Sequence, residues 1–115
     1  MVLWETGEDM AALHLKRKGY RVIKRNFRTK LGEIDIVARE GKTLVFCEVK
    51  TRIGQPYGHP IEAVTGSKQR RIRRVAELYL AALKNPNEFD SVRFDVISIL
   101  SKGPTFKLEH IENAF

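Results

Sequence analysis

Three charged side chains occupy positions where the sequence predicts buried β-strands. Asp35 interrupts the alternating segment EIDIVA (33–38), and Glu48 and Lys50 end the apolar segment TLVFCEVK (43–50). Burying an unpaired charge is costly, so each of these side chains needs a partner or an ion. Residues two apart on a strand project from the same face, which places Glu48 beside Lys50. A short turn between the two segments makes them antiparallel neighbours, and counting outward from that turn brings Asp35 opposite the region of Glu48.

These residue types suit phosphodiester hydrolysis. Mg²⁺ prefers hard oxygen ligands, usually one or two carboxylates with waters and phosphate oxygens. Asp35 and Glu48 supply the carboxylates, and the backbone carbonyl of Val49 could supply a third ligand. Such a metal acidifies a bound water and neutralises charge at phosphorus, while Lys50 could orient the water or stabilise the transition state. The pattern predicts a catalytic Mg²⁺ or Mn²⁺ site; the structural alternative is a salt-bridged cluster at the edge of a sheet.

The distribution of basic residues indicates a polyanionic partner, with nucleic acid first. The formal net charge is +7, and two clusters of cations stand out, eight residues between Lys16 and Lys30 and five in KQRRIRR (68–74). A row of cations on a helix could grip phosphates, although an ordinary solvated face is the alternative. The candidate nucleic-acid contacts are Arg52, Lys68, Arg70, Arg71, Arg73 and Arg74.

The elements that must position these residues follow from hydrophobic periodicity. Helical spacing predicts helices over 7–18, with Thr6 as the N-cap, and over 61–84, where Gly66 could interrupt the start. Runs of β-branched and aromatic residues predict five strands, at 20–27, 33–38, 43–50, 93–100 and 105–111.

Two of the strands carry further information. The segment 43–50 is nearly all apolar, which is typical of a central strand buried on both faces. Alternation in 33–38 predicts Ile34 and Ile36 on one face, with Asp35 and Val37 on the other.

The predicted order is one helix, three strands, a long helix and two strands. This order favours an α/β fold, a mixed sheet flanked by helices, or α+β if the pairing is mostly antiparallel. A chain of 115 residues suits one domain, covering 1–115.

The chain carries no signal for a membrane or an oxidising compartment. No apolar run approaches the roughly 20 residues that a membrane helix needs, and the N-terminus is not typical of a signal peptide. The single cysteine, Cys47, lies in an apolar run and is expected to be a buried thiol. We therefore expect a cytoplasmic protein with no membrane partner.

The same residues resemble a known group. The runs GEIDIVA and LVFCEVKTR and the Arg-Phe-Asp of RFDVISI are similar to those of the YraN-like family of small bacterial proteins. The resemblance implies a restriction-endonuclease-like core and similarity to archaeal Holliday-junction resolvases. It implies that Asp35, Glu48 and Lys50 match the D-(x)n-E-x-K motif, and that Glu8 adds an acid to the metal site. By the same resemblance, branched DNA is the substrate class and a homodimer the working form.

We therefore expect a metal-dependent nuclease that acts on DNA. The first alternative is a nucleic-acid-binding module that keeps the fold without chemistry, and the second is a protein-interaction domain whose charge serves solubility. Glu8 could instead interact with the dipole of its helix. Lys68 or Gln69, early in the second helix, could reach the metal site, and Asp95 is expected to be structural and to hold Arg93.

Overall fold

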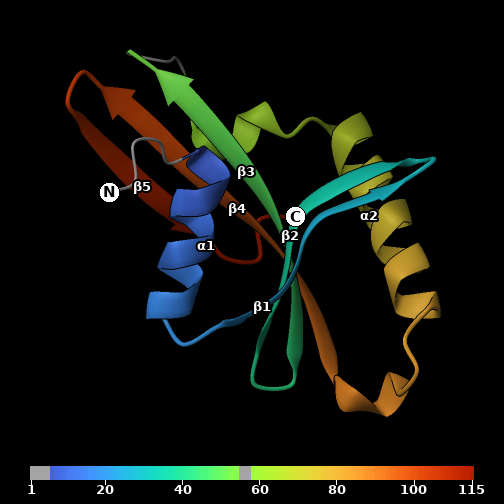
Figure 1. The fold of residues 1–115 in the computed structure, drawn as a ribbon. Helices are drawn as coiled ribbons and strands as arrows, with labels where there is room; N and C mark the ends of the chain where they lie inside the picture. Colours follow the sequence, from blue (N-terminus) through green and yellow to red (C-terminus); the bar gives the residue numbers. More distant parts are fainter. Residues whose placement is uncertain (1–5, 55–57) are drawn as a thin grey trace.

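The structure, a computed structural model, describes residues 6–54 and 58–115 and contains two α-helices and five strands (Figure 1). The elements are α1 (Gly7–Arg17), β1 (Arg21–Thr29), β2 (Gly32–Glu40), β3 (Thr43–Ile53), α2 (Gly66–Ala81), β4 (Ser91–Lys102) and β5 (Thr105–Ile111), with short 3₁₀ turns η1 (Pro60–Ala63) and η2 (Pro86–Glu88). This order confirms the predicted α/β class. Residues 55–57, between β3 and η1, lie outside the described residues.

One mixed sheet forms the centre of the fold. Its strand order is β1-β2-β3-β4-β5, and all neighbours are antiparallel except β3 and β4, which run parallel. A parallel pair requires a crossover connection, and α2 lies in that connection. The central position predicted for the strand at 43–50 is therefore confirmed.

Two hydrophobic clusters cover the two faces of the sheet, and alternate residues of β3 contribute to each. Val45 and Cys47 belong to the cluster that includes residues of α1, whereas Leu44 and Phe46 belong to the cluster that includes residues of α2. Figure 1 shows the two helices on either side of the twisted sheet. Side chains on β3 can therefore be assigned to an α1 face or an α2 face. Neither helix, in the part of the chain that the structure describes, is long and apolar enough to cross a membrane.

Capping residues determine where the helices begin. Thr6 caps α1 as predicted: its hydroxyl accepts from the Asp9 amide at 3.0 Å. The helix predicted over 61–84 is interrupted near its start, where Gly66 is expected to break it: Val64 adopts an extended conformation after η1, and Thr65 caps a new helix that begins at Gly66. The break separates a short turn from the basic helix α2.

The alternation predicted for residues 33–38 is also wrong. Ile36 packs in the α1-side cluster, but Ile34 packs in the α2-side cluster. The cause lies on the neighbouring strand, where Asn26 adopts a positive φ of 53° at the level of Asp35, between the pairs Arg25↔Ile36 and Phe27↔Ile34. A left-handed residue inside a strand rotates the chain that follows it, so the end of the β1–β2 hairpin turns toward α2.

Candidate metal and nucleic-acid site

Asp35 and Glu48 meet where β2 separates from β3. The β2–β3 ladder runs from Glu40↔Thr43 to Ile36↔Cys47, and the next step of that register places Asp35 opposite Glu48. Beyond Ile36 the main-chain hydrogen bonds between β2 and β3 stop. The Val49 amide donates instead to the Asp35 carboxylate, at 2.8 Å. The expected juxtaposition of the two acids is thus present in the structure.

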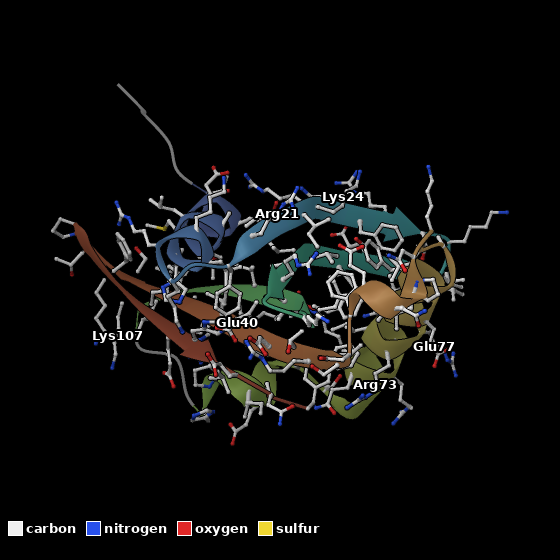
Figure 2. All side chains as sticks on the ribbon, turned by 90° about the horizontal axis from the view of Figure 1, so that it is seen from below. Arg21, Lys24, Glu40, Arg73, Glu77 and Lys107 are labelled. Atoms are coloured by element: carbon white, nitrogen blue, oxygen red, sulfur yellow. The ribbon has the colours of Figure 1, made fainter. Side chains whose placement is uncertain are left out.

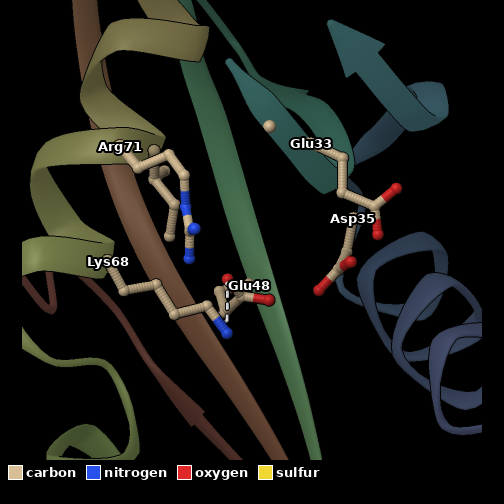
Figure 3. Close-up of a pocket in the computed structure, with 7 residues that line it drawn as sticks. Glu33, Asp35, Glu48, Lys68 and Arg71 are labelled. Carbon is tan, nitrogen blue, oxygen red and sulfur yellow. Dashed lines mark ion pairs between the residues drawn. The ribbon is translucent and has the colours of Figure 1, made fainter. Parts of the chain in front are cut away.

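The two carboxylates line a cavity of about 300 Å³ between the β1–β2 hairpin and α2 (Figure 3). Its lining consists of Gly32, Glu33, Asp35, Glu48, Lys68, Arg71 and Ile72. In Figure 3 the acids project from β2 and β3, while Lys68 and Arg71 reach toward them from α2. The pocket therefore has one acidic wall and one basic wall.

Glu48 carries the largest electrostatic penalty in this pocket. It is only 9% exposed, and burial together with the adjacent Asp35 carboxylate raises the pKa of Glu48 to about 8. The Lys68 and Lys50 ammonium groups oppose this rise in the Glu48 pKa without cancelling it. Two acids held together in a partly buried site favour a bound cation.

Two lysines supply positive charge beside the acids. Lys50 lies two residues beyond Glu48 on β3, and its pKa is lowered by the neighbouring Lys68 ammonium and by burial. Lys68 forms an ion pair with Glu48, with 3.5 Å between Nζ and Oε2. Gln69 does not take this role, because its side-chain amide donates to the Val64 carbonyl at 3.0 Å. Of the two residues proposed to reach the site, Lys68 is the one that does.

The donor set suits a hard divalent cation. Asp35 and Glu48 offer carboxylate oxygens from adjacent strands. Val49 follows Glu48 in the chain and donates its amide to Asp35. Within the described residues, no group of three or more His, Cys, Asp or Glu side chains could hold one ion. Two carboxylates, a carbonyl and solvent or substrate oxygens are the kind of set that Mg²⁺ accepts.

Glu8 does not line the pocket, and its carboxylate is bound by two partners on β1. Its carboxylate accepts from Arg25 Nε at 2.8 Å and from Asn26 Nδ2 at 3.0 Å. Asn26 is the left-handed residue that lies at the level of Asp35, so Glu8 is linked to the bend that presents Asp35. Its role as a metal ligand stays a prediction.

The candidate nucleic-acid contacts differ in whether other groups of the protein already engage their side chains. Arg70, Arg71 and Arg74 are exposed and have no ion pair within residues 6–54 and 58–115. Arg73 lies over the Phe94 ring at 4.6 Å, so part of its surface packs on the protein. Arg52 is half-buried, with Nη2 3.5 Å from the Ser98 hydroxyl.

The basic residues of β1 and α2 lie on different parts of the surface. Figure 2 shows Arg21 and Lys24 along β1, well separated from Arg73 on α2. The pocket lies next to α2, so the α2 cations are the ones that adjoin the two carboxylates.

Asp95 belongs to a separate buried network. It is fully buried and accepts from Arg93 Nε and Nη2 at 2.9 Å each, from His110 at 2.8 Å and from the Asn113 amide at 3.0 Å. Burial alone would raise the pKa of Asp95, but the hydrogen bonds from His110 and Arg93 outweigh it and hold the pKa below its ordinary value. The expected structural role and the contact with Arg93 agree with this geometry.

Sequence reasoning missed Asn26. Its only signal is an asparagine inside a predicted strand, and asparagine is among the residues that tolerate a positive φ. That Asn26 lies opposite Asp35 follows only from the β1–β2 register, which the sequence does not give.

Comparison with known proteins identifies relatives over nearly the whole chain. The model of the uncharacterised protein family UPF0102 matches residues 7–99, which include the acids, both lysines and α2. A UPF0102 protein of Rhodococcus opacus (strain B4) is 47% identical and covers 100% of this chain and 97% of its own length. Two further relatives carry the same family name. The Geobacter metallireducens protein is 50% identical, over 98% of this chain and 91% of its own length. The Geobacter sulfurreducens protein is 53% identical, over 99% of this chain and 88% of its own length. The chain therefore belongs to the uncharacterised protein family UPF0102.

Proposed function

We propose that this protein is a metal-dependent nuclease that hydrolyses phosphodiester bonds in DNA, on a restriction-endonuclease-like fold. The observation that carries the proposal is the pocket in which Asp35 and Glu48 meet, with Lys68 paired to Glu48 and Lys50 next along β3. A purely structural cluster would not need a second acid beside a buried one, because the pair is destabilising without a cation.

Each residue has a distinct role in this proposal. Asp35 and Glu48, with the Val49 carbonyl, would hold Mg²⁺ or Mn²⁺, which supplies an activated water and neutralises charge on phosphate. Lys50 donates to the attacking water or to the phosphoryl oxygens as negative charge develops. By the resemblance to resolvases, Glu8 would complete the metal site from α1.

DNA is the proposed substrate because free cations lie beside the pocket. Arg71 lines it, and Arg70 and Arg74 are exposed on the same helix. Cations on one helix can bind successive backbone phosphates and so orient a duplex toward the pocket. Arg52 and Arg73 are secondary candidates for such contacts, and branched DNA bound by a homodimer is the form that the resemblance favours.

The test is cleavage of labelled linear, flap and four-way DNAs of one sequence, with Mg²⁺, Mn²⁺ or EDTA. Wild type should cut at least one DNA in a metal-dependent manner, and Asp35→Asn and Glu48→Gln should not. Glu77→Gln is the matched control, since Glu77 is exposed on α2 and does not line the pocket. Metal-independent DNA binding without any cleavage would favour the non-catalytic binding module and refute the nuclease.

A further inference from the structure

Lys68 reaches the acidic pair from a different element than the acids do. It lies in the first turn of α2, where its amide donates to the capping hydroxyl of Thr65, and its long side chain crosses the pocket to Glu48. The Lys68 side chain is 25% exposed and that of Glu48 is 10% exposed. The ion pair is therefore partly shielded from solvent, and the carboxylate side is the more deeply buried of the two.

The ammonium contacts one of the two proposed metal-binding carboxylates. Figure 3 shows Lys68 directed at Glu48, across the pocket from Asp35. A divalent cation held by Glu48 would stand within a few ångströms of this ammonium, where like charges repel strongly in a partly buried site. The ion pair and a bound divalent cation are therefore competing ways to neutralise the same carboxylate.

The surroundings allow the lysine to move away. A lysine has a flexible four-carbon stem and a compact charge, and Arg71, which lines the same pocket one helical turn further on, is exposed to solvent. An ammonium displaced from Glu48 would move along the wall of α2 toward Arg71. There it would add a second cation to the side of the pocket where a phosphate must enter.

We infer that the Lys68 ammonium exchanges between Glu48 and the substrate phosphate. This inference rests on the proposed metal-dependent function. Lys68 neutralises Glu48 until a divalent cation takes that carboxylate, and the released ammonium then binds a phosphate of the nucleic acid. Metal binding and phosphate binding are consequently coupled, and the coupling must be reciprocal.

The experiment is Mn²⁺ titration by calorimetry of wild type, Lys68→Gln and the control Lys84→Gln at pH 8.5, where Glu48 of wild type is ionised. Lys84 is exposed beyond the end of α2, so its replacement removes the same charge without touching the pocket. Removing the competing ammonium should tighten Mn²⁺ binding about fivefold to tenfold in Lys68→Gln, as expected for loss of a partly buried ion pair. Lys84→Gln should bind Mn²⁺ as wild type does.

Thermal unfolding provides a second readout. With EDTA, Lys68→Gln should melt below wild type because Glu48 has lost its partner, and saturating Mn²⁺ should close most of that gap. If wild type binds Mn²⁺ and Lys68→Gln binds it equally or more weakly, the exchange is refuted, whereas the proposed metal site is not. Failure of both proteins to bind Mn²⁺ would refute the metal site, and the exchange with it.

Discussion

Replacing Glu48 by glutamine measures what the acidic pair costs the fold. The pKa of Glu48 rises from an ordinary 4.5 to about 8, so the folded protein holds this proton more tightly than the unfolded chain does. Between these two pH values the folded state binds more protons, and the free energy of unfolding must fall as pH rises. The Glu48 contribution is complete below about pH 4.5 and is lost by about pH 8.

The size of the effect can be bounded. A rise from 4.5 to about 8 corresponds to at most about 5 kcal/mol at alkaline pH. This figure already includes the opposing effect of the Lys68 and Lys50 ammonium groups, and the variant leaves the Lys68 ammonium without its carboxylate partner. We therefore expect Glu48→Gln to be about 1–2 kcal/mol more stable than wild type at pH 8, without metal.

Urea denaturation in EDTA, from pH 5 to 8.5, is the assay. The stability gap between Glu48→Gln and wild type should widen as pH rises and level off above about pH 8, whereas Glu77→Gln should follow wild type throughout. Mn²⁺ should then favour wild type, by about 2.7 kcal/mol at a hundredfold excess over its Kd. A gap that is flat with pH, or a variant less stable at pH 8, would refute the reasoning, because Glu48 would then ionise without cost.

Three further predictions concern other parts of the molecule. Asp95→Asn should lower the free energy of unfolding by about 3 kcal/mol in urea titrations, since it breaks a buried ion pair; the lowered pKa of Asp95 means that this stability is present above about pH 4 and lost toward lower pH, so a variant with unchanged acid sensitivity would contradict the assignment. Lys50→Ala should reduce DNA cleavage about 10²–10³-fold with an unchanged circular dichroism spectrum, and an equal rate would remove Lys50 from the chemistry. Replacing Arg70, Arg71 and Arg74 together by alanine should flatten the log–log salt dependence of DNA binding, measured by fluorescence anisotropy, by about 0.9 for each phosphate that the protein no longer neutralises; an unchanged slope would identify an ordinary solvated face.

The elements with strong local signals were predictable from the sequence. The strand over 105–111 has the predicted bounds, and the capped start of α1 at Gly7 agrees as well. Helical spacing could not separate η1 from α2, because the apolar residues Ile61 and Val64 continue the period across the break. The capping hydroxyl of Thr65 marks the true start, and its signal is weaker than the periodicity around it.

The acidic pair was predictable because it depends on register. A two-residue turn at Gly41 and Lys42 fixes the β2–β3 ladder, and that ladder fixes which residue opposes Glu48. The contact between Lys68 and Glu48 depends on tertiary packing. No strand pairing relates α2 to β3, because the chain between them runs through η1 and the break before α2. Their position early in the helix made Lys68 and Gln69 the two candidates, and the packing of α2 brings only Lys68 to the pocket.

The failure of alternation at Ile34 accompanies the opening of the pocket beside Glu48. A regular antiparallel ladder would have continued past Ile36 and closed the space beside Glu48 with main chain. Instead, the left-handed conformation of Asn26 turns the β1–β2 hairpin toward α2, and the Asp35 carboxylate takes the Val49 amide that the ladder leaves free. The pocket exists because the sheet is irregular at this level. A sequence that satisfied simple alternation here would bury Ile34 more regularly, but it would have no cavity in which the two carboxylates could meet.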